Sequence, residues 1–90
     1  MNELLEFIAK SLVDAPEAVE VGEIQKGDLT VLTLRVDKND IGRVIGKNGR
    51  IAKVIRTLVK SAGSKSGKRY AVDILSEDEE PGDNYRRNDG

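Results

Sequence analysis

The most informative segment of the 90-residue chain is Ile41-Gly42-Arg43-Val44-Ile45-Gly46-Lys47-Asn48-Gly49-Arg50-Ile51. Its apolar residues recur at helical spacing on both sides of Gly46 and Gly49. A glycine inside a helix costs roughly 1 kcal/mol relative to alanine, so two glycines three positions apart favour a turn over one continuous helix. The segment therefore predicts two helices joined by a tight turn at residues 46–49.

The rest of the chain predicts one further helix and three strands around this junction. In chain order the predicted elements are a helix at 2–13, strands at 18–25 and 29–36, the two helices of the junction at 41–45 and 50–62, and a last strand at 68–75. Asn2 is the predicted cap of the first helix, and residues 26–28 predict the turn of an antiparallel hairpin. Gly63 is the predicted C-terminal cap of the helix at 50–62. The apolar stripe of that helix, expected to face the core, comprises Ile51, Val54, Ile55, Leu58, Val59 and Ala62.

This order of elements, αββααβ, predicts an α+β fold with two layers. The three strands form one sheet, and the helices cover one of its faces. We place the folded domain at residues 1–75. Residues 76–90 are acidic and carry Tyr85 as their only apolar side chain, so this segment is predicted to be a disordered C-terminal tail.

Composition argues against several classes of function. The chain has no Cys and no His, which removes disulfides, thiolate metal sites and the commonest general base. Gly42 and Gly46 are spaced one residue too closely for a nucleotide-binding P-loop, and Asn48 replaces the Ser or Thr of that motif. We therefore expect no enzymatic activity, no metal and no cofactor. The lack of cysteine indicates a reducing, cytoplasmic compartment, and no apolar run approaches the ~20 residues of a membrane span.

The net charge of −1 hides a strong asymmetry along the chain. Residues 1–29 carry seven acidic and two basic side chains, a net charge of −5. Residues 30–75 carry three acidic and eleven basic side chains, a net charge of +8, and residues 76–90 carry six acidic and two basic ones, a net charge of −4. The window 41–69 holds nine Lys and Arg side chains and no acidic one. Such a window indicates an anionic partner or a solvated face of a small domain. Aromatic residues make up only 3% of the chain, which excludes an aromatic platform for stacking bases.

The junction at 46–49 combines the features of a clamp for a phosphate backbone. Its glycines let a phosphate approach the main chain, because they carry no side chain. The helix after the turn presents unpaired N–H groups and the positive end of its dipole there. Lys47 and Arg50 add cationic side chains at the same place. We expect the apolar residues Val44, Ile45 and Ile51 to hold the turn against the core.

Residues 44–51, Val44-Ile45-Gly46-Lys47-Asn48-Gly49-Arg50-Ile51, resemble the signature loop of KH domains, a GXXG loop that clamps four nucleotides. The Ile before the first glycine, the Ile two positions after the second, and the upstream pair Ile41-Gly42 strengthen the match. The element order is that of type II KH domains. A stand-alone domain of this size with a Leu-rich first helix is similar to the small bacterial KhpA family, and the resemblance covers about residues 1–75.

The resemblance implies a single-stranded RNA-binding protein that acts as an RNA chaperone or post-transcriptional regulator, linked in some bacteria to cell shape and cell-wall biogenesis. It also implies pairing with itself as a homodimer, or with a second KH protein, KhpB (also called Jag or EloR). By the family's motif, residues Gly46, Lys47, Asn48 and Gly49 form the RNA-binding loop. The further RNA-binding residues implied around it are Ile41, Gly42, Arg43, Val44, Ile45, Arg50, Ile51 and Lys53, of which Ile41, Val44, Ile45 and Ile51 bound an apolar groove for bases.

Two groups of residues keep alternative interpretations. Lys53, Arg56 and Lys60 share one face of the helix at 50–62, and they either extend the phosphate track or lie on a solvated face. Leu32 and Leu34 belong either to the wall of the groove or to the core.

Two other functions compete with RNA binding. The first is a protein-interaction subunit that uses the exposed side of the helix at 50–62 and has little RNA binding of its own. The second is a DNA-binding helix-turn-helix, which is disfavoured because the second helix offers mainly Lys and Arg to base edges. No small-molecule substrate is expected.

Overall fold

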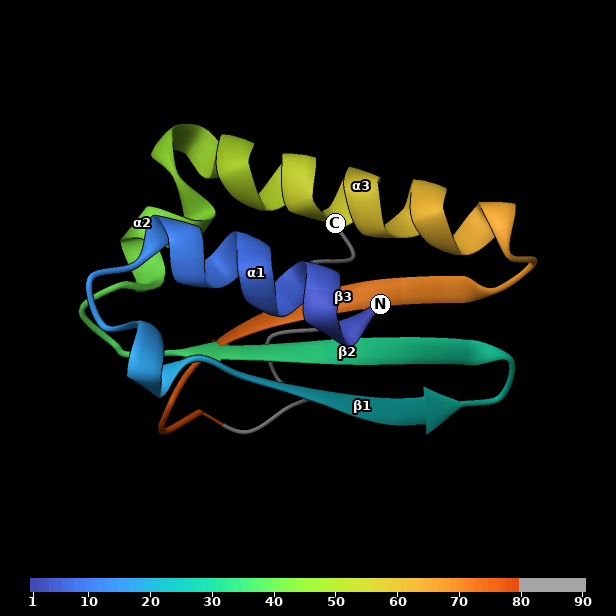
Figure 1. Cartoon of the computed structure of the whole chain (residues 1–90), viewed down its shortest axis with the longest axis horizontal. Coiled ribbons are helices and arrows are strands. Elements are labelled where there is room, and N and C mark those ends of the chain that lie inside the picture. The colour runs from blue at the N-terminus through green and yellow to red at the C-terminus, as the bar shows by residue number, and fades with distance from the viewer. Residues whose placement is uncertain (80–90) are drawn as a thin grey trace.

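A computed structural model describes residues 1–79 of the chain (Figure 1). In chain order it contains α1 (Asn2–Leu12), η1 (Pro16–Ala18), β1 (Glu20–Lys26), β2 (Leu29–Val36), α2 (Ile41–Ile45), η2 (Lys47–Gly49), α3 (Arg50–Lys65) and β3 (Arg69–Ser76), where η denotes a 3₁₀ helix. The predicted order αββααβ is therefore confirmed, with element ends that differ from the expected ones by a few residues. None of the helices in this part of the chain is both long and apolar enough to span a bilayer.

The three strands form one mixed sheet with the order β1-β2-β3. β1 and β2 are the predicted antiparallel hairpin, in which Gly22 lies opposite Thr33. β3 runs parallel to β2, so that Thr33 also lies opposite Asp73. A parallel pair of strands needs a long crossover connection, and α2 and α3 form it.

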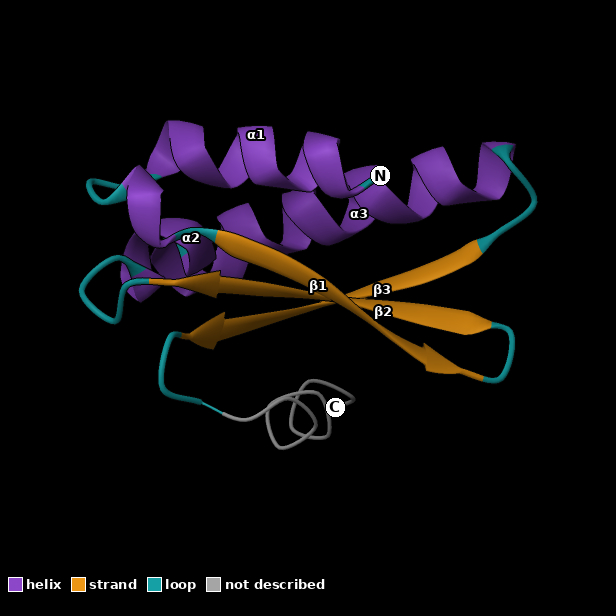
Figure 2. Ribbon diagram, turned by 60° about the horizontal axis from the view of Figure 1, so that its bottom comes forward, coloured by secondary structure: helices purple, strands orange, loops and turns teal. Residues whose placement is uncertain are grey.

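The helices α1, α2 and α3 all lie on the same face of the twisted sheet, as predicted (Figure 2). The core between the two layers contains Leu5 and Ala9 of α1, Leu32, Leu34 and Val36 of β2, Val44 of α2, Ala52, Ile55 and Val59 of α3, and Val72 and Ile74 of β3. Leu32 and Leu34 are fully buried in it, so they belong to the core and not to the wall of a groove. Each such leucine stabilises the fold by about 2 kcal/mol through burial.

The cap predicted at Gly63 is wrong. α3 continues to Lys65, and Gly63 lies buried inside it, where a Cβ atom would be 2.4 Å from Cδ2 of Tyr70. The turn that follows the helix is made instead by Gly67, which lies two residues after Lys65 and has a φ of 71°. The N–H groups of Gly67 and Lys68 donate to the carbonyl oxygens of Ser64 and Gly63, at 3.0 and 2.9 Å. The glycine at 63 is therefore needed for close packing against the sheet, and the one at 67 for the turn.

Two other details of the helices differ from the prediction. Asn2 is the first residue of α1 and not its cap, because Met1 occupies the N-cap position and no side chain makes a capping hydrogen bond. The buried stripe of α3 is also narrower than expected, since 57% of Val54 and 48% of Leu58 remain exposed. Each of these residues precedes a buried residue, Ile55 or Val59, and is therefore rotated by about 100° around the helix from the core.

The end of β3 lies one residue beyond the predicted domain boundary. Ser76 is the last residue of the strand, and residues 77–79 form a turn after it. The N–H of Ser76 donates to Oε1 of Glu79 at 2.8 Å. The rest of the predicted disordered tail, residues 80–90, lies outside the described residues.

Candidate nucleic-acid interface

The predicted clamp lies at the junction of α2 and α3. α2 ends at Ile45, α3 begins at Arg50, and Gly46 and the 3₁₀ turn η2 connect them. The junction is at the opposite end of α3 from the turn that leads into β3 (Figure 1). Since α3 has 16 residues, the two ends are about 24 Å apart.

The loop owes its shape to three backbone positions with positive φ. They are Gly46 (φ 76°), Asn48 (φ 58°) and Gly49 (φ 73°). The N–H of Gly46 donates to the carbonyl of Gly42 at 2.8 Å and ends α2, while the N–H of Gly49 donates to the carbonyl of Gly46 at 3.2 Å. Asparagine tolerates this left-handed region better than most other side chains. The Asn at position 48 therefore fits the loop conformation, a signal that was present in the sequence.

The glycines of the site differ in what surrounds them. The space that a Cβ atom of Gly46 would need is occupied by the side chain of Ile51. At Gly42 and Gly49, by contrast, a Cβ atom would meet no heavy atom within 4 Å. This distance leaves aside the adjacent residues in the chain and, for Gly42, the backbone of its own helix. A ligand can therefore approach the main chain closely at Gly42 and Gly49, whereas Gly46 is needed for packing.

Four exposed polar side chains surround the loop, namely Lys47, Asn48, Arg50 and Lys53. Within residues 1–79, the three cations among them form no ion pair. They lie at the start of α3, where the first N–H groups of a helix have no partner within it and the helix dipole is positive. The positive charge at this place is thus available to an anion.

Arg43 differs from these cations because it is already paired. Its Nη2 lies 2.8 Å from Oδ2 of Asp14, and its Nε lies 3.2 Å from Oδ1 of Asp40. The guanidinium therefore connects α2 to the segment that follows α1. This structural contact competes with the RNA contact predicted for Arg43.

Asp40, the residue directly before α2, also shapes the junction. Its carboxylate is buried and accepts the backbone N–H groups of Asp14 (3.1 Å) and Ala15 (3.0 Å). It makes no capping hydrogen bond, although it is the N-cap residue of α2. Asp40 fixes the end of α1 against the start of α2, and the sequence separation of 25 and 26 residues explains why no local pattern indicated this contact.

The four apolar residues of the site differ in how deeply they are buried. Val44 is fully buried, so its side chain supports the loop from below and cannot touch a base. Ile41 and Ile51 are partly buried and pack against the core. Ile45 was expected to pack there as well, but it is more exposed than they are, with 38% of its surface accessible. Of these four side chains, Ile45 thus offers the most apolar surface to a ligand.

Arg56 was assigned either to the phosphate track or to a solvated face. Its Nε donates to the main-chain carbonyl of Val72 at 3.3 Å. Since β3 is an edge strand, this bond ties α3 to the outer edge of the sheet. Lys53 and Lys60, which share this side of α3, are exposed.

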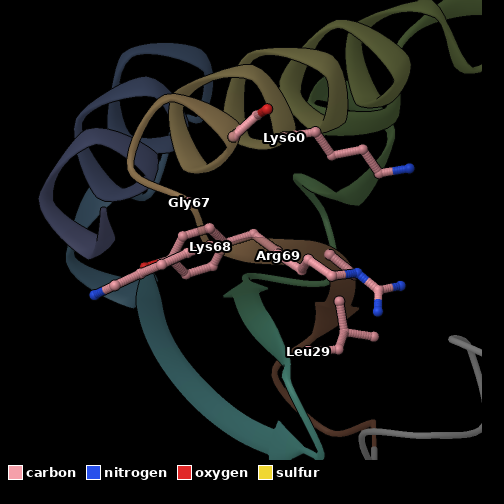
Figure 3. A pocket seen from close by; sticks show the side chains of 8 residues that line it. Leu29, Lys60, Gly67, Lys68 and Arg69 are labelled. Atoms are coloured by element: carbon pink, nitrogen blue, oxygen red, sulfur yellow. The ribbon is translucent and has the colours of Figure 1, made fainter.

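A second basic concavity lies at the far end of α3, lined in part by Leu29, Lys60, Gly67, Lys68 and Arg69 (Figure 3). In this view the side chains of Lys60 and Arg69 extend to one side and that of Lys68 to the other, so the cations do not converge. Arg69 is also paired with Asp28 at 3.1 Å. The C-terminal end of a helix carries the negative end of its dipole, which makes this place less suited to an anion than the loop.

Comparison with known proteins shows similarity over most of the chain. The family model described as "KhpA/KhpB, KH domain" matches residues 2–74. The RNA-binding protein KhpA of Clostridium perfringens is 53% identical over 75 residues, which cover 83% of this chain and all of that protein. The RNA-binding protein KhpA of Borreliella burgdorferi is 45% identical over 73 residues, which cover 81% of this chain and 89% of that protein. The RNA-binding protein KhpA of Aquifex aeolicus is 44% identical over 75 residues, which cover 83% of this chain and 95% of that protein.

Proposed function

This chain belongs to the KhpA/KhpB family of KH domains, and from that premise we propose that it binds single-stranded RNA through the loop at residues 46–49. The observation that carries the proposal is the combination of open main chain at Gly42 and Gly49 with three cations that lack ion pairs within residues 1–79. Its relatives are named RNA-binding proteins, which supports a binding role without catalysis.

The RNA backbone lies against the turn η2 in this proposal. Phosphates accept hydrogen bonds from the N–H groups at the start of the turn and from Lys47 and Arg50. The bases then point toward the exposed side chain of Ile45 and make van der Waals contact with it. Phosphate contacts carry no sequence information, so we propose that binding tolerates many sequences.

A second partner follows from the small size of the site. One loop that holds about four nucleotides binds weakly, and linking two domains raises the overall affinity through effective concentration. Val54 and Leu58 are exposed on α3, which favours this helix as a surface for pairing with a second copy or with a second KH protein such as KhpB. We propose that a pair of this kind, with weak and sequence-tolerant binding, acts as an RNA chaperone or post-transcriptional regulator in the cytoplasm. The family's link to cell shape suggests the process in which it acts.

The proposal is tested by reversing the charge of the loop. Lys47→Asp together with Asn48→Asp changes the net charge by −3 at exposed positions, and we expect the affinity for a single-stranded oligoribonucleotide to fall at least tenfold (about 1.4 kcal/mol). The matched control is Lys65→Asp with Ser66→Asp, which makes the same charge change at the far end of α3. Affinity is measured by fluorescence anisotropy, and circular dichroism checks the fold of both variants.

Two results would contradict RNA binding at the loop. In the first, both variants lose affinity equally, which indicates a general electrostatic effect. In the second, the loop variant binds RNA like the unmodified chain. If the unmodified chain binds RNA very weakly but sediments as a dimer, the interaction subunit is the better description.

A further inference from the structure

Arg43 and Ile45 lie on opposite sides of the short helix α2. They are two residues apart, so their positions differ by about 200° around the helix axis. Ile45 is the exposed side chain that the proposed function places against the bases. Arg43 extends the other way, where its guanidinium reaches the carboxylate of Asp14 in the segment after α1. The side of α2 that carries Arg43 is therefore not the side that the bases would contact.

Arg43, Asp14 and Asp40 form a closed set of contacts. Nη2 of Arg43 lies 2.8 Å from Oδ2 of Asp14, and Nε of Arg43 lies 3.2 Å from Oδ1 of Asp40. The backbone N–H of Asp14 donates to the same Oδ1 of Asp40 at 3.1 Å. Each of the three residues thus contacts the other two, and together they join the end of α1 to the start of α2.

Burial distinguishes this set from an ordinary surface ion pair. The side chain of Asp40 is only 3% exposed, whereas those of Arg43 and Asp14 are 54% and 76% exposed. A buried carboxylate that loses its cationic partner is strongly destabilising, because an uncompensated charge remains in the interior. Arg43 supplies that cation. A move of the guanidinium from this place to a phosphate would therefore be costly.

The orientation of α2 sets the position of the loop that follows it. α2 has five residues and leads directly into Gly46, whose N–H donates to the carbonyl of Gly42. Val44 is buried and fixes one side of the helix against the core. Arg43 precedes it and lies about 100° away around the axis, so its contacts fix a second direction. Two such anchors determine how α2 is rotated and where its end lies.

We propose that Arg43 is a positioning residue for RNA binding: its contacts with Asp14 and Asp40 fix α2, and with it the loop at 46–49, and it makes no phosphate contact itself. This role rests on the proposed function, because the loop that it positions is the one assigned to the RNA backbone. It replaces the RNA contact implied for Arg43 by the family's motif. A loop that is already held in its binding conformation has less freedom to lose, so Arg43 raises the affinity without touching the RNA.

Asp14→Asn gives opposite results for the two roles of Arg43. If Arg43 positions the loop, loss of its exposed partner lowers the affinity for a single-stranded oligoribonucleotide, and we expect a loss of about threefold. If Arg43 binds a phosphate, the freed guanidinium and the removed negative charge both raise the affinity. The matched control is Glu17→Gln, which removes an equal charge from an exposed residue of the same connecting segment and is expected not to lower the affinity. Asp14→Glu keeps the carboxylate and is expected to retain most of the affinity.

Two further measurements separate positioning from phosphate contact. Arg43→Gln is expected to lower the affinity at least fivefold while the slope of log K against log salt stays unchanged, whereas loss of a phosphate contact reduces that slope by about 0.7. In the chain without RNA, we expect the ¹⁵N heteronuclear NOE of the amides at 46–49 to fall in Arg43→Gln and Asp14→Asn but not in Glu17→Gln. This second readout needs no RNA, so a failure of RNA binding and a failure of the positioning role can be told apart.

Two outcomes would overturn the proposal. The first is an affinity that Asp14→Asn raises or leaves unchanged. The second is a loop that is as rigid in both variants as in the unmodified chain. Circular dichroism checks the fold of each variant, and Asp14→Asn keeps the test open if Arg43→Gln does not fold, because the side chain of Asp14 is mostly exposed.

Discussion

Gly46 lies so close to Ile51 that a Cβ atom on the glycine would be 2.6 Å from Cγ1 of the isoleucine. The same glycine has φ 76° and ψ 175°, a region of backbone conformation that is essentially restricted to glycine. Two independent constraints therefore fix the residue at this position. Gly42, one turn earlier, has a helical backbone and open space where a Cβ atom would be.

This contrast predicts opposite effects of the same substitution at the two glycines. Gly46→Ala combines backbone strain with crowding against Ile51, and we expect the free energy of unfolding to fall by about 3 kcal/mol. Gly42→Ala removes the entropic cost of a glycine in a helix, and we expect it to raise the free energy of unfolding by about 0.5–1 kcal/mol. Equilibrium unfolding in urea measures both. Similar values for the two variants would mean that the loop can relax around a side chain at position 46.

The dependence of RNA affinity on salt reports how many phosphates the loop neutralises. For single strands, the slope of log K against log salt changes by about 0.7 for each contact. We therefore expect Arg50→Gln and Lys53→Gln each to reduce the slope by up to this amount, because both cations are exposed near the start of α3. Lys10→Gln is the control, since Lys10 lies on α1 and pairs with Glu6 at 3.4 Å.

Slopes that do not change in the two loop variants would place the phosphates elsewhere. The concavity beside Lys60 and Lys68 would then be the next site to test.

Most of the fold could be predicted from the sequence because its signals are local. The branched residues at 29–36 marked β2 with its observed ends, and the glycines at 46 and 49 marked the turn between the helices. Buried faces were less predictable. Val54 and Leu58 fit the helical spacing of apolar residues in α3 but lie just outside the side of the helix that the sheet covers. The spacing of apolar residues does not tell how wide that covered side is.

Parts of the candidate site were hidden because they depend on contacts between distant segments. Gly63 has the sequence signature of a cap, and only the position of Tyr70 against it shows a packing role. Arg43 lies directly before the segment that resembles a KH loop, yet besides the nearby Asp40 its guanidinium pairs with Asp14, far earlier in the chain. No pattern within a window of the sequence contains such pairs.

The buried carboxylate of Asp40 gives a prediction about how α1 is held beside the junction of α2 and α3. Asp40→Asn removes the negative charge and turns one of its two acceptors into a donor that faces the N–H of Asp14 or Ala15. We expect the free energy of unfolding to fall by about 2 kcal/mol, because a hydrogen bond to a charged group is lost and a buried donor is left unsatisfied. Asp37→Asn is the matched control, since its Oδ1 accepts the exposed N–H of Asn39 at 2.8 Å and asparagine keeps that oxygen. The control is expected to change stability by less than about 0.5 kcal/mol, and urea unfolding of the two variants compares them directly. A loss of stability from Asp40→Asn as small as that expected of the control would show that the contact between the end of α1 and α2 contributes little to stability.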